Sequence, residues 1–265
     1  MENKKTAIIG CGNLGLSILN GLLEEESIQP SNITVTRRNI ETLEHLREKG
    51  IKLSNDNASA INASEIIIVA LKPYNILEVL EELKTLFVPG KHTLVSLATG
   101  ISLQQIQNIV TIPIPIFRAM PNTAADVGMS MTCISSNSND NKAADLVKQC
   151  FNSIGESIII DESLMDAATV LGACGIAYVL RFIRGMIQGG IQIGFDAKTA
   201  SQIVTHTVSG AAELLIKRNE HPEFEIDKVT TPKGCTIAGL NEMEHNGFSS
   251  ALIKGIVTSF EKIEK

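Results

Sequence analysis

The glycine-rich segment "GCGNLG", residues 10–15, constrains the fold more than any other feature of this chain. It follows the apolar run "TAIIG" (6–10), which predicts a buried strand, and it opens "NLGLSILNGLLEE" (13–25), which has helical periodicity. Glycines in the G-x-G-x-x-G spacing between a strand and a helix are typical of a dinucleotide-binding turn. The helix start would present free N–H groups to a pyrophosphate, whereas a plain tight turn is the alternative. The predicted cofactor residues here are Gly10, Gly12, Asn13, Leu14 and Gly15.

Short apolar runs continue to alternate with amphipathic segments through the first 160 residues. Residues 40–50 predict a helix that ends at Gly50. Strands alternating with helices predict βαβ units, so we expect an α/β fold with an N-terminal Rossmann domain, doubly wound around a mostly parallel sheet. Further buried strands are expected at residues 33–36, 65–71, 92–98, 114–120, 129–135 and 156–160.

The pattern of apolar and polar residues changes near residue 162, after which the chain has helical periodicity and no strand-like run. We therefore predict a dinucleotide-binding domain over 1–161 and an all-helical substrate and dimerisation domain over 162–265. Each glycine inside a helix costs about 1 kcal/mol relative to alanine, so their number requires a reason. Close helix packing, completed by a second subunit, is that reason; a monomeric bundle is the alternative. The glycines include Gly172, Gly175, Gly185, Gly189, Gly190 and Gly210.

Composition excludes several functional classes. A net charge of −6 and an aromatic content of 4% argue against a nucleic-acid partner. No uninterrupted apolar run reaches the length of about 18 residues that a membrane span needs, and the N-terminus has no signal-peptide pattern. Five scattered cysteines, none in a Cys-x-x-Cys pair, favour reduced thiols in the cytoplasm. The histidines have no metal-ligand spacing, so no metal is expected.

The end of the second strand, "VTRRN", indicates which dinucleotide is bound. An NAD site usually has an acidic residue at this position, which would repel the 2′-phosphate of NADP. Thr36, Arg37 and Arg38 stand here instead, and arginine can bind a phosphate with two hydrogen bonds. The pattern predicts NADPH as the cofactor, with NADH possible; a solvated basic turn is the alternative.

Three later segments end strands of the predicted sheet, whose carboxyl ends line the ligand crevice in this fold. They are "VALKP" (69–73), "SLATGIS" (96–102) and "FRAMPNT" (117–123). Pro73 suits the first position of a helix, where its missing N–H does no harm. Arg118 and Asn122 could each be a ligand or a loop anchor. The predicted cofactor residues from these segments are Ala70, Lys72, Pro73, Ala98 and Asn122.

Taken together, the segments resemble the pyrroline-5-carboxylate reductases of proline biosynthesis over essentially the whole chain. The resemblance implies hydride transfer from NAD(P)H to the ring C=N of pyrroline-5-carboxylate, giving L-proline. It also implies a homodimer interlocked through the helical domain, or a higher homo-oligomer, and contact of Asn57 with the adenine-side ribose. The matching segments are "IIGCGNLG", "VALKP", "SLATGIS", "FRAMPNT", "LMDAATVLGACGIAY" and "TTPKGCTIAGLNEMEHNGF".

Two segments depart from the family pattern. The family usually has Ser-Gly-Ser-Gly-Pro-Ala-Tyr where this chain has "LGACGIAY" (171–178), so the proline and serines are lost. Lys233 replaces the first of two paired glycines in the late turn. These departures put the usual substrate or catalytic efficiency in doubt more than the fold.

The late turn "TTPKGCT" (230–236) is the predicted substrate site. Pro232 would stop the preceding helix and Gly234 would allow an unusual backbone conformation. N–H groups at the start of the next helix would bind a carboxylate, and the Thr236 hydroxyl would hold the ring nitrogen instead of acting as a strong acid. The alternative is that Thr231 or Thr236 is only an N-cap. The predicted substrate residues are Met120, Thr231, Gly234, Cys235 and Thr236, with Thr236 also catalytic.

Two other functions fit the same two-domain plan. The first is another NADP-dependent reductase, such as a 3-hydroxyacid dehydrogenase, which would need a lysine acid or base from the helical domain. The second is a non-catalytic NADP-sensing protein whose altered "LGACGIAY" run no longer supports turnover. The available lysines are Lys198, Lys217, Lys228 and Lys233.

Overall fold

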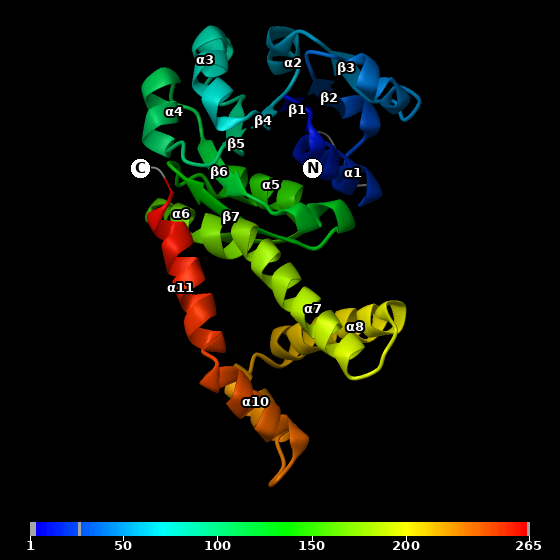
Figure 1. Ribbon diagram of the computed structural model, residues 1–265. Helices are drawn as coiled ribbons and strands as arrows, with labels where there is room; N and C mark the ends of the chain where they lie inside the picture. The colour runs from blue at the N-terminus through cyan, green and yellow to red at the C-terminus, as the bar shows by residue number, and fades with distance from the viewer. Residues whose placement is uncertain (1–3, 26–27, 264–265) are drawn as a thin grey trace. The chain divides into compact units, whose positions relative to one another are not determined.

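The computed structural model describes residues 4–25 and 28–263, and within them the chain forms two compact units. The first unit runs to Cys174 and takes in Ile263, and the second is Gly175–Lys262. The domain boundary predicted between residues 161 and 162 stays a prediction. The two compact units divide later, after Cys174, inside a continuous helical stretch. Figure 1 shows the sheet and its helices in the first unit and the long helices of the second.

An eight-stranded sheet forms the centre of the first unit, in the order β3-β2-β1-β4-β5-β6-β7-β8. The strands from β3 to β6 are parallel; β7 is antiparallel to β6 and parallel to β8. The chain order reverses between β1 and β4, which is where this fold binds ligands. The strands are β1 (Thr6–Ile9), β2 (Ile33–Thr36), β3 (Lys52–Ser54), β4 (Ile66–Val69), β5 (Thr93–Ser96), β6 (Ile116–Met120), β7 (Ser130–Ser136) and β8 (Gly155–Ile159).

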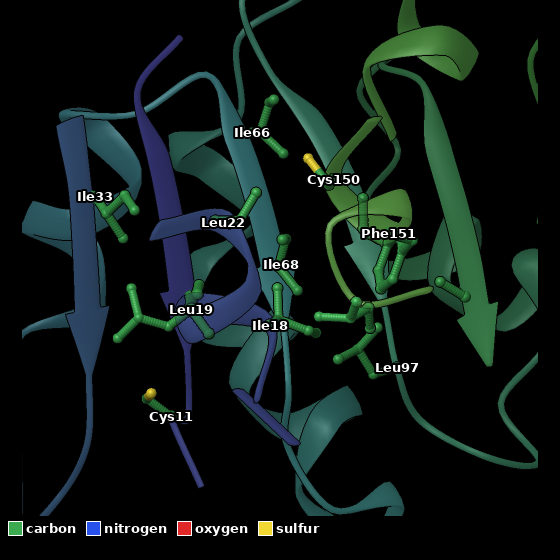
Figure 2. Close-up of a cluster of buried hydrophobic side chains, with 14 of the residues drawn as sticks. Cys11, Ile18, Leu19, Leu22, Ile33, Ile66, Ile68, Leu97, Cys150 and Phe151 are labelled. Carbon is green, nitrogen blue, oxygen red and sulfur yellow. The ribbon is translucent and has the colours of Figure 1, made fainter. Parts of the chain in front are cut away.

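The central strands β1, β4, β5 and β6 are buried at every position because helices cover both faces of the sheet, and β4 is apolar throughout. Along β4, Ile66 and Ile68 pack in one apolar cluster while Ile67 and Val69 pack in the other. The first cluster lies under α1 (Asn13–Glu24) and α5 (Asn141–Asn152), and Figure 2 shows α1 side chains packed over the sheet in it. The second lies under α2 (Asn57–Asn62), α3 (Pro73–Leu83) and α4 (Leu103–Ile109).

The mostly parallel sheet and the helix opened by the glycines confirm the predicted Rossmann unit. The helix predicted over 40–50 is wrong, because this segment forms only a short 3-10 helix, Glu41–Leu46. Its two buried side chains, Leu43 and Leu46, are three residues apart, which suits the three-residue 3-10 turn. The short elements β3 and α2 were not predicted at all.

The second unit contains five helices and, over residues 175–262, no strand. A Cβ at Gly190 would lie 3.2 Å from Cβ of Ala200, so this glycine allows a close approach of α7 to α8. A Cβ at Gly185, Gly189 or Gly210 would meet nothing within 4 Å among the described residues, so packing inside one chain does not explain these three. The helices are α7 (Gly175–Gln192), α8 (Ala197–Arg218), α9 (Pro222–Lys228), α10 (Cys235–His245) and α11 (Phe248–Glu261).

Large apolar side chains lie exposed on these helices. Ile216 of α8 has an exposed fraction of 71%, and α11 exposes Leu252, Ile253 and Val257. Ile193, in the turn that follows α7, has an exposed fraction of 79%. The continuous helical stretch Glu162–Gln192 is long and apolar enough to cross a membrane by length and composition alone. The sequence predicts no membrane span, because no uninterrupted apolar run is long enough. The length and composition of this stretch do not confirm that prediction.

Candidate active site

The turn between β1 and α1 depends on Gly10. Its φ of +79° is in the left-handed region, and a Cβ there would lie 2.3 Å from Cδ2 of Leu71. The N–H of Gly12 donates to the carbonyl oxygen of Gly10 at 2.7 Å, which closes the turn. A side chain at residue 10 would thus be both strained and overlapping, so glycine is required there.

The start of α1 is suited to bind an anion. Gly12 is the N-cap and makes no side-chain capping bond, and the first turn of α1 has no acidic residue. The N–H groups of residues 13–15 have no partner within the helix because they precede its first full turn. A Cβ at Gly12 would meet only the carbonyl oxygen of Gly10, at 3.9 Å, so the space beside it is open. These features fit a dinucleotide pyrophosphate.

A cleft of about 600 Å³ lies at this turn, at the carboxyl ends of β1, β4 and β6. The structure brings eight of the predicted residues together in its lining: Gly12, Asn13, Leu14, Ala70, Lys72, Pro73, Met120 and Asn122. Sequence reasoning missed eight further lining residues: Ser17, Leu71, Leu97, Thr99, Pro121, Thr123, Asp126 and Ala173. Most of these, Ala173 among them, lie in or beside the quoted segments, but nothing in the sequence pointed to Asp126.

Other predicted cofactor residues lie outside the lining of the cleft. Gly10 and Gly15 form the turn and the first turn of α1. Ala98 is buried in the second apolar cluster, and the exposed Thr99 lines the cleft in its place. The prediction that Pro73 begins a helix is confirmed, since α3 starts at this residue with Lys72 as its N-cap.

Thr36 links the end of β2 to the glycine turn. Its hydroxyl oxygen accepts the N–H of Gly10 at 3.3 Å, and its hydroxyl donates to Oδ1 of Asn57 at 2.6 Å. Its carbonyl oxygen accepts the N–H of Cys11 at 2.8 Å. The structure thereby brings Asn57, which was predicted only from the resemblance, to the turn that the glycines form.

Arg37 and Arg38 follow directly on β2, half-buried and exposed respectively, and neither forms an ion pair with the described part of the chain. Burial raises the pKa of the Cys11 thiol to about 12, and the positive charge of Arg37 acts in the opposite direction. The charge of Arg37 therefore acts on Cys11 in the glycine turn, and the Cys11 thiol stays neutral because burial has the larger effect. Both guanidinium groups are free to bind a phosphate, a role that stays a prediction.

Arg118 and Asn122 are both anchored by the chain itself. Arg118 is buried, and its Nη1 lies 3.1 Å from Oε1 of Glu162. Asn122 accepts the N–H of Ala124 at 3.0 Å through its side-chain oxygen and donates from Nδ2 to the carbonyl oxygen of Gly172 at 3.2 Å. The loop-anchor alternative is thus the one that the geometry supports for both residues.

The turn at 230–236, in the second unit, differs from its prediction in three ways. The left-handed residue is Lys233, with φ +59°, whereas Gly234 has φ −74°. The N–H of Gly234 donates to the carbonyl oxygen of Thr231 at 2.9 Å and is not free for a ligand. Pro232 does not stop the preceding helix, because α9 already ends at Lys228.

Neither threonine is an N-cap, so that alternative is wrong. Gly234 is the N-cap of α10 and makes no side-chain capping bond, and Thr236 lies in the first turn. A Cβ at Gly234 would lie 2.5 Å from Oγ1 of Thr231, so glycine is required for this close approach and not for its φ. The N–H groups of Cys235 and Thr236, which precede the first full turn, remain without a helical partner.

Comparisons with known proteins cover the whole chain. Residues 162–265 match a family described as pyrroline-5-carboxylate reductase dimerisation, and residues 5–100 match one described as NADP oxidoreductase coenzyme F420-dependent. The chain is 42% identical to pyrroline-5-carboxylate reductase 2 of Dictyostelium discoideum, covering all of this chain and 93% of that protein. It is 45% identical to pyrroline-5-carboxylate reductase 1 of the same organism, of which it spans only 48%.

Solved structures agree with these relatives. A pyrroline carboxylate reductase of Plasmodium falciparum, with NADP bound, is 27% identical with a TM-score of 0.87, covering 99% of this chain and 97% of that one. The pyrroline-5-carboxylate reductase of Coxiella burnetii is 25% identical with a TM-score of 0.93, covering 99% and 98%. The exposed apolar side chains of residues 175–262 thus lie in a segment that matches a dimerisation family.

Proposed function

The chain belongs to the pyrroline-5-carboxylate reductase family, and from this premise we propose that it reduces pyrroline-5-carboxylate to L-proline with NADPH. The observation that carries the proposal is a full-length relative, 42% identical, in a chain whose glycine turn opens on a cleft of about 600 Å³. An oxidoreductase acting on a C=N bond needs a place for a nicotinamide and a holder for the substrate anion. The two units of this chain each offer one of these.

Cofactor binding is assigned to the first unit. The uncapped start of α1 would hold the pyrophosphate, and Asn57 would contact the adenine-side ribose beside Thr36. Arg37 and Arg38 would bind the 2′-phosphate, which favours NADPH over NADH. When bound, the cofactor supplies the hydride that the reaction requires.

Substrate binding is assigned to the turn at 230–236 of the second unit. The N–H groups of Cys235 and Thr236 carry the positive end of the α10 dipole, which would hold the carboxylate. The Thr236 hydroxyl would hydrogen-bond the ring nitrogen and position the protonated imine. The ring carbon gains the hydride, the C=N π electrons pass to nitrogen, and the nitrogen keeps its proton, which leaves the neutral amine of the ring.

The test is an assay of NADPH oxidation at about 340 nm with pyrroline-5-carboxylate, with L-proline identified as the product. We expect saturable oxidation that yields one proline per NADPH. Parallel reactions with 3-hydroxyacids and NADP test the dehydrogenase alternative. Tight NADPH binding with no oxidation by any imine would contradict the proposal and support a cofactor-sensing role.

We further propose that the protein works in the cytoplasm as a homodimer or a higher homo-oligomer. The exposed apolar side chains of α7 and α11 would then be covered by a second copy. Light scattering coupled to size-exclusion chromatography measures the mass directly, against 28.5 kDa for one chain. A monomer at micromolar concentration would contradict the oligomer, and cell fractionation tests the location.

A further inference from the structure

Asn122 is a buried asparagine whose polar atoms are all bound within the chain. It is 8% exposed and follows β6 at the floor of the cofactor cleft. Its main-chain N–H donates to Oγ of Ser130 at 3.0 Å, and its side chain bonds Ala124 and Gly172 as described above. The oxygen and the nitrogen of this side chain each make one hydrogen bond within the chain, so the protein itself fixes the orientation of the amide.

The carbonyl that Asn122 binds belongs to an unusual helical turn. Residues 169–174 form a π-helix, between the α-helical residues Met165–Ala168 and α7. Single π-helical turns are rare and frequently lie at functional sites, because they change which backbone groups pair along the helix. Gly172 lies within this turn, and Ala173, the next residue, lines the cofactor cleft.

The other side-chain contact of Asn122 fixes a second segment of the cleft. Asn122 is the N-cap of the 3-10 helix Thr123–Val127, whose residues Thr123 and Asp126 line the same cleft. One buried amide therefore joins the 3-10 helix, through its oxygen, to the π-helical turn, through its nitrogen. Two segments almost fifty residues apart in the sequence are held at one cleft by a single side chain.

We propose that Asn122 is a positioning residue for the cofactor: it fixes the π-helical turn and the 3-10 helix, so that Ala173, Thr123 and Asp126 keep the shape of the cleft. The inference rests on the proposed function, in which this cleft binds NADPH. It replaces direct cofactor contact by Asn122 with an effect through the segments that it holds. A substitution can remove the amide N–H that donates to Gly172 while it keeps an oxygen that accepts the N–H of Ala124.

Asn122→Asp makes this separation. The carboxylate keeps an acceptor for the N–H of Ala124 but places an oxygen against the carbonyl oxygen of Gly172. Loss of one buried hydrogen bond is expected to raise Kd for NADPH about tenfold in a fluorescence titration. The same loss is expected to appear as a rise in KM for NADPH that exceeds any fall in kcat, a split that a general loss of stability would not produce.

Asn137→Ala is the matched control. The side chain of Asn137 accepts the N–H of Ile116 at 2.9 Å, at the start of β6, whereas the cleft lies at the end of this strand. Its removal is expected to lower Tm while Kd for NADPH stays at the wild-type value. Asn122→Ala, which adds no charge, is measured beside Asn122→Asp, so that weaker NADPH binding by both variants excludes repulsion by the new carboxylate as the cause.

Two results would overturn the inference: NADPH binding by the Asn122 variant as in the wild type, or equal weakening of binding by the Asn137 variant. A wild-type protein that binds NADPH but does not reduce pyrroline-5-carboxylate would contradict the proposed function alone. In that case a selective loss of NADPH affinity in the Asn122 variant still supports the positioning role.

Discussion

Thr36 and Asn57 are joined by a hydrogen bond of 2.6 Å from the threonine hydroxyl to Oδ1 of the asparagine. The same hydroxyl oxygen accepts the N–H of Gly10. One small side chain at the end of β2 therefore holds both the glycine turn and the start of α2.

Replacing Thr36 by valine keeps the shape of the side chain and removes both of these hydrogen bonds. At about 1 kcal/mol for each bond, Kd for NADPH is expected to rise roughly 5- to 30-fold. Thr34→Val, on the same strand, is the control and should leave Kd unchanged. The measurement is a fluorescence titration with NADPH, and equal affinities in the two variants would contradict the role of Thr36.

Arg37→Ala and Arg38→Ala test the choice of cofactor. A charge-assisted hydrogen bond to the 2′-phosphate contributes about 1.5–3 kcal/mol, so kcat/KM for NADPH should fall roughly 10- to 150-fold in at least one variant. The value for NADH should hardly change, because NADH lacks this phosphate. Arg47→Ala is the control, since that guanidinium is paired with Glu44 at 2.7 Å. An equal loss with both cofactors would sink the assignment.

Thr236→Ala tests the substrate turn. Removal of one hydroxyl that bonds the ring nitrogen in the transition state should lower kcat/KM for pyrroline-5-carboxylate roughly 10- to 1,000-fold. Thr236→Ser, which keeps a hydroxyl, should recover part of the loss. Thr230→Ala removes a hydroxyl that donates to the carbonyl oxygen of Ile226 at 2.8 Å and should have little effect on turnover. Wild-type kinetics in Thr236→Ala would exclude the role of this hydroxyl.

Two neighbouring residues of the same turn should respond in opposite directions. A lysine in the left-handed region is strained by about 1 kcal/mol, so Lys233→Gly should raise the free energy of unfolding by up to that amount. Gly234→Ala should lower it, because the new Cβ would meet Oγ1 of Thr231 at 2.5 Å. Chemical denaturation measures both, and a stabilised Gly234→Ala variant would show that the turn is described incorrectly.

His92 gives the first unit a pH-dependent stability. Burial, and then the charge of Lys91, lower the pKa of this imidazole below 6.5, whereas Glu65 acts in the opposite direction. Between the lowered pKa and 6.5 the unfolded chain binds more protons, so the free energy of unfolding falls as the pH decreases through this window. The fall in Tm between about pH 7.5 and about pH 5.5 should be smaller in His92→Asn than in wild type. His45→Gln, at an exposed histidine, should keep the wild-type slope.

The sequence was sufficient for the central sheet because its signals are strong and local. Residues 66–69 are apolar at every position, which only a strand covered on both faces requires. Short elements lack such a signal. The strand Lys52–Ser54 has three residues, one of them exposed, and two buried leucines between 41 and 46 fit a 3-10 helix as well as an α-helix.

The site was predicted where a motif fixes the backbone and missed where tertiary contacts decide. The glycine spacing was enough to locate Gly12 and Asn13 in the cleft. Ala173 reaches the cleft only through the π-helical turn, which no pattern of apolar residues predicts. In the late turn, composition suggested that Gly234 takes the strained conformation, but the adjacent Lys233 does, because Gly234 is needed for contact with Thr231.

Glu162 lies where the matched dimerisation segment begins, yet its carboxylate serves the first unit. Oε1 accepts the N–H of Leu103 at the start of α4 and pairs with the buried Arg118. Met165, a few residues later, packs against Met120 and Cys133. A fragment that ends at residue 161 would therefore leave the buried Arg118 without its ion-pair partner and expose the apolar surface that Met165 covers. When the helical portion is exchanged between relatives, the junction should be placed after Cys174. Residues 162–174 then stay with the first unit, whose side chains they contact.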